Sequence, residues 1–199
     1  MQTKAPNPIN SIPGKKTLPI IQTYFEFNQL KHLYRQGWLK RGVPEERCES
    51  VAEHTLGVAI LAMMLAESTF PELDANKIIR MALIHDFGEI YTGDIIPVDG
   101  VSTEEKHHRE QEAVLQVLGR LPNGAEYIAL WEEFEACESP EAKFIRQIDR
   151  LEMGFQSKIY ELQGVLHTDE FTNSARRALT DENLQQILAV LDTFKNQQS

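Results

Sequence analysis

Apolar residues recur along this chain at the spacing of an α-helix, and no stretch shows sustained alternation with the period of a β-strand. Val51, Val58 and Leu65 illustrate the pattern, because residues seven apart lie on nearly the same face of a helix. Helices with apolar faces must bury those faces against other elements, and here the other elements are also helical. The sequence therefore predicts an all-α fold.

Helix start signals and breaks rich in glycine or proline divide the chain into predicted helices. Ser50 and Glu53 form a capping-box pair, and Ser139 precedes a proline in the first helical turn. We expect helices from Ile20 to near Arg35, from Ser50 to before Pro71, from Asp74 to Asp86, over 104–118 and 126–136, from Ser139 through Asp149, and from Asp181 to Phe194. The segments between them are expected to be loops.

The first 19 residues differ from the rest of the chain. Four of the nine prolines fall within residues 1–19, and this stretch lacks periodic apolar residues. We expect a flexible or loosely docked arm there. Residues 20–199 have the size of one domain with a single hydrophobic core, so a single helical domain is predicted.

The charge of the chain bears on its partners. The formal net charge is −10, which repels nucleic-acid backbones and anionic lipid headgroups, so neither is expected as a partner. This acidity can serve solubility alone. Alternatively, it means that an anionic substrate must be held by local cations or by a metal ion.

Cysteine usage and hydropathy indicate a compartment. Cys48 and Cys137 are far apart and fit no CxxC pattern, so free thiols are expected. The first residues show no secretory signal, and no apolar run approaches the roughly 20 residues needed to cross a bilayer. We therefore expect a cytoplasmic protein.

Two histidines and two aspartates have unusual surroundings for their residue type. The neighbours of His54 on its helical face are apolar, and His85 ends an apolar run and is followed at once by Asp86. Asp149 lies between apolar residues on its own helical face. An ionised carboxylate in such a place is costly unless it is paired or bound to a metal.

Each of these residues alone is weak evidence for a site. An interior histidine is more often a hydrogen-bonded core residue, and Asp149 has Arg146 and Arg150 close by in the sequence. Together, two imidazoles and two carboxylates form a mixed nitrogen and oxygen ligand set. Such a set suits Mn, Co, Fe, Ni, Zn or Mg with positions left open for water.

The order of His, His-Asp and Asp on separate helices resembles the HD-domain superfamily of metal-dependent phosphohydrolases. A larger part of the chain, from about Leu30 to Glu161, is similar to the 5'-deoxynucleotidase family, which includes HD-domain-containing protein 2 and the bacterial YfbR-type nucleotidases. The matching blocks are Arg35-x-Gly37-Trp38, Arg41-Gly42-Val43, Glu49 to His54, His85-Asp86-x-x-Glu89, Thr92-Gly93-Asp94-Ile95-x-Pro97, Glu104 to His107, and Ala142-Lys143-Phe144-x-x-Gln147-x-Asp149. These ordered blocks are much more specific than a His-Asp pair.

The resemblance implies an HD-domain helical bundle that hydrolyses deoxynucleoside 5'-monophosphates to deoxynucleosides and phosphate with the help of one divalent metal ion. The residues that match the family's metal ligands are His54, His85, Asp86 and Asp149. Relatives are commonly dimers, so the resemblance also implies a homodimer.

The same resemblance implies roles for residues around the metal. Arg35 matches an arginine that orients the phosphate, and Glu89 and Asp94 match acidic residues implicated in catalysis or nucleotide contact. The residues expected to border the sugar and base are Trp38, Asp94, Ile95, Ile96 and Pro97. Glu89 would be either a general acid for the leaving 5'-oxygen or a base that orients water, and the sequence leaves both open.

Simpler interpretations of these residues stay open at this point. Arg35 would then be a surface charge, Glu89 a solvated acid at a helix end, and Asp94 a residue that bonds backbone amides in a loop. The charged run over 104–108 is more typical of a solvated helix start than of a second metal site.

Two other functions compete with the nucleotidase. One is an HD phosphodiesterase or nucleotide polyphosphate hydrolase, although the chain offers neither a clear second set of histidines nor a long basic segment. The other is a catalytically silent HD scaffold that binds a nucleotide or a partner.

Overall fold

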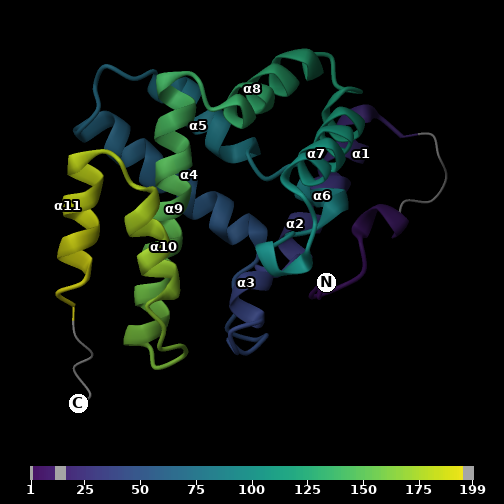
Figure 1. Cartoon of the computed structure of the whole chain (residues 1–199). Helices are drawn as coiled ribbons and strands as arrows, with labels where there is room; N and C mark the ends of the chain where they lie inside the picture. Colours follow the sequence, from purple (N-terminus) through teal and green to yellow (C-terminus); the bar gives the residue numbers. More distant parts are fainter. Residues whose placement is uncertain (1, 12–16, 195–199) are drawn as a thin grey trace.

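The computed structural model describes residues 2–11 and 17–194, which form helices joined by short loops (Figure 1). The helices are η1 (Pro8–Ser11), α1 (Pro19–Phe27), α2 (Gln29–His32), α3 (Gln36–Leu39), α4 (Val51–Ser68), α5 (Ala75–Ile84), α6 (Glu89–Thr92), η2 (Pro97–Asp99), α7 (Thr103–Leu118), α8 (Gly124–Ala136), α9 (Pro140–Leu162), α10 (Glu170–Ala178) and α11 (Glu182–Leu191). Within the described residues the only β-type pairings are isolated bridges, so the all-α prediction is confirmed.

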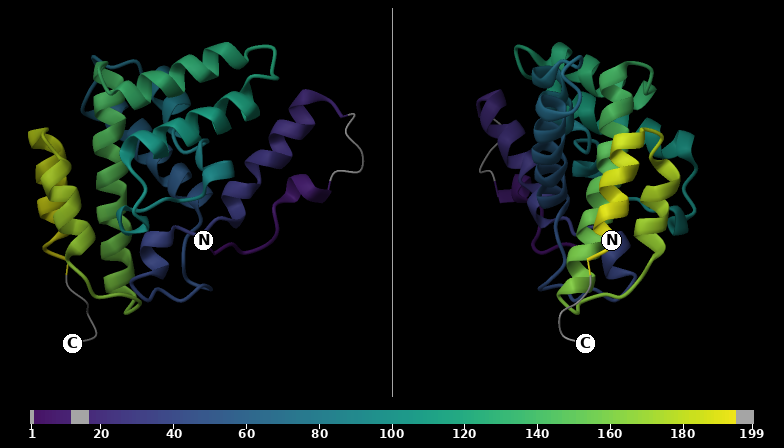
Figure 2. Two further views of the ribbon diagram at one scale, coloured as in Figure 1. Left: turned by 45° about the vertical axis from the view of Figure 1, so that its right-hand side comes forward. Right: turned by 90° about the vertical axis from the view of Figure 1, so that its left-hand side faces the viewer.

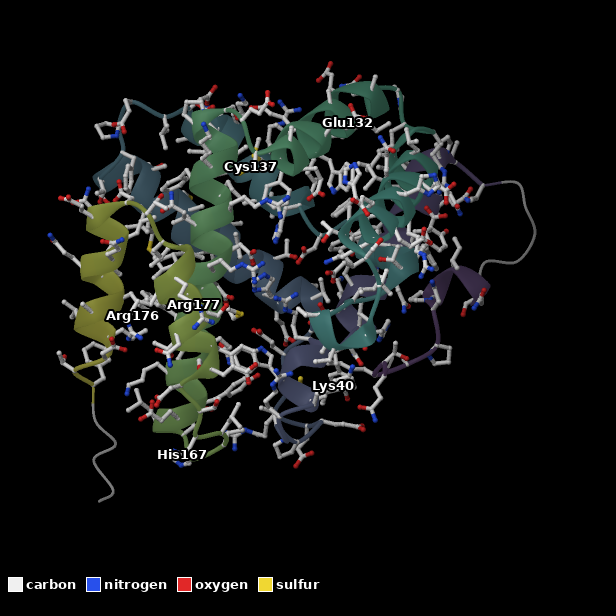
Figure 3. All side chains as sticks on the ribbon, in the orientation of Figure 1. Lys40, Glu132, Cys137, His167, Arg176 and Arg177 are labelled. Carbon is white, nitrogen blue, oxygen red and sulfur yellow. The ribbon has the colours of Figure 1, made fainter. Side chains whose placement is uncertain are left out.

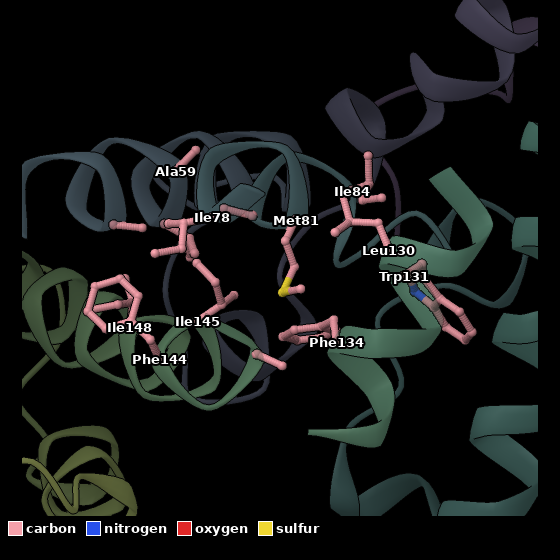
Figure 4. Packing of buried hydrophobic residues seen from close by; sticks show 14 of the residues in the cluster. Ala59, Ile78, Met81, Ile84, Leu130, Trp131, Phe134, Phe144, Ile145 and Ile148 are labelled. Atoms are coloured by element: carbon pink, nitrogen blue, oxygen red, sulfur yellow. The ribbon is translucent and has the colours of Figure 1, made fainter. Parts of the chain in front are cut away.

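Three helices, α4, α5 and α9, make the centre of the bundle. α4 packs along α5, and both pack against α9. Figure 4 shows the apolar side chains between them, among which Ile78, Met81, Ile145 and Ile148 are fully buried. On one side of α9 lie α10 and α11, while α7 and α8 lie on the other (Figure 2). The central helices are therefore held from both sides.

The predicted helix starts are confirmed where the sequence offered a capping residue. Ser50 and Glu53 form the complete capping box, in which the Ser50 hydroxyl accepts from the Glu53 amide and the Glu53 carboxylate accepts from the Ser50 amide. Asp74, Ser139 and Asp181 each accept hydrogen bonds from the first turns of α5, α9 and α11. These caps fix where the helices that form the centre begin.

The helix predicted from Ile20 to near Arg35 is interrupted near Asn28 and ends early, at His32. The structure divides it into α1 and α2, and Leu33 has an extended backbone conformation. The reason is competition for backbone groups, because the Leu33 carbonyl accepts from Val51, and the His32 carbonyl accepts from Lys4. Segments distant in sequence thus replace the intrahelical bonds.

Three short or polar helices were not predicted. α3 and α6 are single turns next to glycines, and α10 lies in a stretch assigned to a loop. The side chain of Arg176 in α10 binds Asp192 beyond α11 at 2.6 Å, which ties these two helices together (Figure 3). The predicted last helix ends at Leu191, before Phe194.

The described part of the N-terminal arm makes specific contacts. Gln2 exchanges hydrogen bonds with the Gln36 side chain, Lys4 pairs with Glu53, and Thr3 forms a bridge with Leu33. Parts of the predicted arm, residues 1 and 12–16, lie outside the described residues, as do residues 195–199 of the predicted domain.

Among the described helices, α4 is the one that is long and apolar enough to cross a membrane by length and composition alone. The core helix of a globular protein meets the same criteria. α4 lies against α5 and α9 in the centre of the bundle, which accounts for its apolar composition.

The capping box of α4 predicts a measurable contribution to stability. Replacing Ser50 with alanine removes the acceptor for the Glu53 amide, which typically costs about 1 kcal/mol. We expect Ser50→Ala to lower the free energy of unfolding by that amount in chemical denaturation. Ser68→Ala, at the exposed other end of the same helix, is the matched control and should change it much less. Equal effects of the two substitutions would contradict the prediction.

Candidate metal centre and active site

The three central helices bring the four predicted ligand residues together. His54 comes from the first turn of α4, His85 and Asp86 follow the last turn of α5, and Asp149 lies in the middle of α9. The Nε2 atom of His54 is 3.1 Å from Oδ1 of Asp149 and 3.9 Å from Oδ2 of Asp86. Nε2 of His85 is 3.3 Å from the same Asp86 oxygen. Residues far apart in sequence thus meet at one point.

The donor atoms at this point fit a cation. One ligand atom each of His54, His85 and Asp149 can be chosen so that all lie within 4.8 Å of one another. Nε2 of His85 and Oδ2 of Asp86 are buried and have no hydrogen-bond partner in the protein. Nδ1 of His85 donates to the Ala82 carbonyl at 2.6 Å, so its Nε2 carries a free lone pair in the neutral ring. Orphaned acceptors that converge in this way match the mixed ligand set of a divalent metal ion.

Electrostatics keeps the two aspartates ionised. Burial alone would raise the pKa of Asp149, but the hydrogen bond and positive charge of His54 outweigh burial and lower it far below its usual value. Burial likewise opposes ionisation of Asp86, and the charges of His85, His54 and Arg35 reverse this effect and lower its pKa. Ionised carboxylates are the form that ligates a metal.

Arg35 faces the same centre from the loop before α3. Its Nη1 atom lies 3.3 Å from Oδ1 of Asp94, and the side chain is largely buried. Burial lowers the pKa of Arg35, but nearby carboxylates raise it well above its usual value, and these are, in order of effect, Asp94, Asp86, Glu89 and Asp149. The guanidinium is therefore a permanent cation beside the ligand set.

Asp94 uses both carboxylate oxygens to hold this loop. Besides the bond to Arg35, its Oδ2 accepts from the backbone amide of Gln36 at 2.6 Å. The simpler interpretation of Asp94, as a residue that accepts from a backbone amide, therefore describes one of its two contacts. In this arrangement Asp94 orients Arg35, while direct contact between Asp94 and a nucleotide stays a prediction.

Glu89 lies at the start of α6, three residues after Asp86 in the sequence, and is 3% exposed. Its Oε2 atom is buried without a hydrogen-bond partner. Burial raises its pKa well above the usual value, and the neighbouring charges of Asp86 and Asp94 raise it further. Burial and the neighbouring acids thus favour the neutral form of this carboxyl group, and Glu89 is not a solvated helix-end acid.

The remaining predicted contact residues lie around this centre. Trp38 is 2% exposed, packs against Tyr160 and Phe171, and donates its Nε1 hydrogen to Glu49 at 2.7 Å. Ile95 and Ile96 are half-buried, and Pro97 is exposed at the start of η2. Contact of these four residues with a sugar or base stays a prediction.

Two functional residues were missed from the sequence. Lys106 lies in the run predicted to be a solvated face, yet its Nζ is 3.5 Å from both Oε1 of Glu110 and the carbonyl of Ile95. Burial lowers its pKa, but the carboxylates of Glu110, Glu89 and others raise it, so it is a second cation near the acids. The signal available was helical spacing, because Lys106 and Glu110 share a face with buried Val114 and Val117.

The second missed residue is Glu152, which lies one turn after Asp149 on α9. Its Oε2 atom is 2.6 Å from Nδ1 of His54. Glu152 is three residues after Asp149, so the two lie on the same helical face. This spacing was the signal in the sequence that could have pointed to Glu152. Of the other histidines, His107 stacks on Trp131, and His167 lies in the exposed loop between α9 and α10 (Figure 3).

Comparisons with known proteins agree with this arrangement. The HD domain family matches residues 27–198 of the chain. The 5'-deoxynucleotidase HDDC2 of Mus musculus is 38% identical over 174 residues, which cover 84% of this chain and 84% of that protein.

Solved structures are similar along nearly the whole chain. The PH0347 protein from Pyrococcus horikoshii OT3 has a TM-score of 0.72 and 31% identity, covering 88% of this chain and 99% of that one. A predicted metal-dependent phosphohydrolase from Magnetospirillum magnetotacticum MS-1 has a TM-score of 0.68 and 28% identity, covering 87% of this chain and 89% of that one. The order of ligand residues, their meeting point and these matches agree, and the chain belongs to the HD domain family.

Proposed function

We propose that this protein is a metal-dependent phosphomonoesterase that converts deoxynucleoside 5'-monophosphates to deoxynucleosides and phosphate. The observation that carries the proposal is the meeting of two imidazoles and two carboxylates beside Arg35 and the buried Glu89. The relative from Mus musculus is named a 5'-deoxynucleotidase, which supports the choice of substrate class.

We propose that one divalent cation is held by His54, His85, Asp86 and Asp149. When bound, such a cation polarises the phosphoryl group and a water molecule and offsets the charge of the substrate. The set of nitrogen and oxygen ligands admits Mn, Co, Mg, Fe, Ni or Zn, and a metal screen would choose among them.

Binding of a phosphate dianion requires positive charges in addition to the metal ion, because the carboxylates of the centre repel it. Arg35 presents a guanidinium whose fork of donors matches phosphate oxygens. Asp94 fixes that guanidinium at one nitrogen, and its other donors stay available to a ligand. Lys106 supplies the second positive charge from α7.

Glu89 is proposed as the proton donor to the leaving 5'-oxygen. A leaving alkoxide must be protonated, and an acid that is neutral near pH 7 can do this. The buried Oε2 of Glu89 and its raised pKa favour this role over that of a base.

The proposal is tested by phosphate release from a panel of deoxy- and ribonucleoside monophosphates, with a diester and a triphosphate included. We expect release from the deoxynucleoside 5'-monophosphates in the presence of Mn²⁺ or Co²⁺, and background values with the diester. Preferred cleavage of the diester or triphosphate would favour those hydrolases instead. No release from any substrate with any metal would favour a silent scaffold.

Removal of one metal ligand gives a sharper result. We expect Asp149→Ala to reduce phosphate release to background and to lower bound metal measured by elemental analysis, since a carboxylate ligand is lost. The helical circular-dichroism signal should be retained. Asp169→Ala, an exposed acid before α10, is the matched control and should behave as wild type. Full activity in Asp149→Ala would remove Asp149 from the ligand set.

The phosphate contact of Arg35 is tested separately. A charge-assisted hydrogen bond is worth roughly 1.5–3 kcal/mol, so Arg35→Ala should raise the Michaelis constant for a deoxynucleotide by about tenfold to a hundredfold. Bound metal should stay unchanged. Arg41→Ala is the matched control, because Arg41 is in the same region and pairs with Glu170. An unchanged Michaelis constant in Arg35→Ala would place the phosphate contact elsewhere.

We further propose that the protein acts in the cytoplasm. Cys48 and Cys137 are both free thiols, which fits a reducing compartment. Fractionation of cells that express the protein would test the location.

We also propose that the protein is a homodimer that pairs through α4. Leu56, Ile60, Met63 and Met64 are all exposed, and their spacing puts them on one outward stripe of this helix. An apolar stripe of this kind is typical of a protein–protein interface.

Ile60→Glu tests the pairing, because it puts a charge into the stripe at a position that is already 45% exposed in the single chain. We expect light scattering to give a dimer for wild type and a monomer for Ile60→Glu. Val190→Glu introduces the same charge on exposed α11 and should leave the dimer intact. A wild-type monomer, or a dimer that persists in Ile60→Glu, would refute the α4 interface.

A further inference from the structure

His54 lies between two carboxylates of the same helix. Its Nε2 atom faces Asp149 at 3.1 Å and its Nδ1 atom faces Glu152 at 2.6 Å. The histidine is 1% exposed and Glu152 is 8% exposed. Within the described part of the chain, the side-chain hydrogen bonds and ion pairs of Glu152 go to His54 alone. The polar contact of this carboxylate within the described residues is therefore with the ring.

The contact decides which ring nitrogen carries the proton. An ionised carboxylate can only accept, so Nδ1 of His54 is the donor. When Nε2 releases its proton, as metal binding requires, it is Nε2 that is left with the lone pair. That lone pair points to the place where Asp149 and His85 also present ligand atoms. His85 is oriented in the same sense, since its Nδ1 donates to the Ala82 carbonyl. One ring is thus oriented by a neutral carbonyl and the other by a carboxylate.

The partner helix leaves space for this carboxylate. An ideal Cβ atom at Gly57, one turn after His54 on α4, would lie 2.5 Å from Oε1 of Glu152 and 3.1 Å from its Cδ. Glycine inside a helix costs roughly 0.5–1 kcal/mol relative to alanine. Packing therefore explains the glycine at position 57, because any larger residue there would displace the Glu152 side chain from His54.

We propose that Glu152 is a positioning residue that fixes the Nδ1-protonated form of His54 and thereby strengthens metal binding at the four-ligand centre. The inference rests on the proposed metal centre. A carboxylate that accepts from a ligating imidazole also makes its other nitrogen a better donor, and loss of such a partner typically costs about tenfold to a hundredfold in metal affinity.

The test is calorimetric titration of the metal-free full-length protein with Co²⁺, which reports the dissociation constant without turnover. Glu152→Gln keeps the shape but loses the charge, and we expect about tenfold to hundredfold weaker binding at unchanged stoichiometry. Gly57→Ala should also weaken binding, although it raises helix propensity. Glu161→Gln, the same change on the same helix beside Lys158, is the matched control and should bind as wild type.

A second readout addresses the ring itself. Nuclear magnetic resonance of isotope-labelled histidines in the Zn²⁺-loaded wild type should show His54 with its proton on Nδ1 and the metal on Nε2. The opposite tautomer would overturn the proposal, as would equal dissociation constants for wild type and Glu152→Gln. The latter result would leave the nucleotidase proposal intact. If Asp149→Ala bound Co²⁺ as tightly as wild type, the metal centre itself, and with it the proposed function, would fail.

Discussion

The arrangement of the molecule depends on two carboxylates that lie largely out of water between the central helices. Burial opposes the ionisation of Asp86 and Asp149, and neighbouring imidazole and guanidinium groups lower the pKa of each carboxyl below its usual value. Those groups come from different helices, so the compensation exists only when α4, α5 and α9 are packed in one way. The apolar contacts of Met81, Ile145 and Ile148 supply that packing next to the charged residues (Figure 4). Core and site are consequently formed by the same three helices.

The sequence predicted the parts of this arrangement that follow from local chemistry. Ser50, Asp74 and Ser139 cap their helices through bonds within a few residues, so the helix starts could be identified without tertiary information. The four candidate ligands stood out because charged or polar groups interrupt apolar faces, and their interpretation as one ligand set came from the resemblance to HD-domain phosphohydrolases. The end of the helical segment at His32 could not be found, since it depends on backbone bonds from Lys4 and from Val51 at the start of α4, both distant in sequence.

Polar helices limited the prediction of the surrounding residues. The first half of α7 is almost entirely polar, so the inward direction of Lys106 is marked only by its spacing from the buried Val114 and Val117 further along the helix. Trp38 is a comparable case, because its packing against Tyr160 and Phe171 joins segments that are distant in sequence. Such choices depend on neighbours that only the complete fold supplies.

Under the proposed role of Arg35 as the phosphate contact, its bond to Asp94 has a consequence for the thermodynamics of substrate binding. A long side chain that becomes ordered on association typically loses about 0.5–1.5 kcal/mol of conformational entropy. Here the guanidinium is already fixed by a carboxylate, and that carboxylate is itself fixed by the Gln36 amide. The entropic cost is met during folding, before any nucleotide arrives.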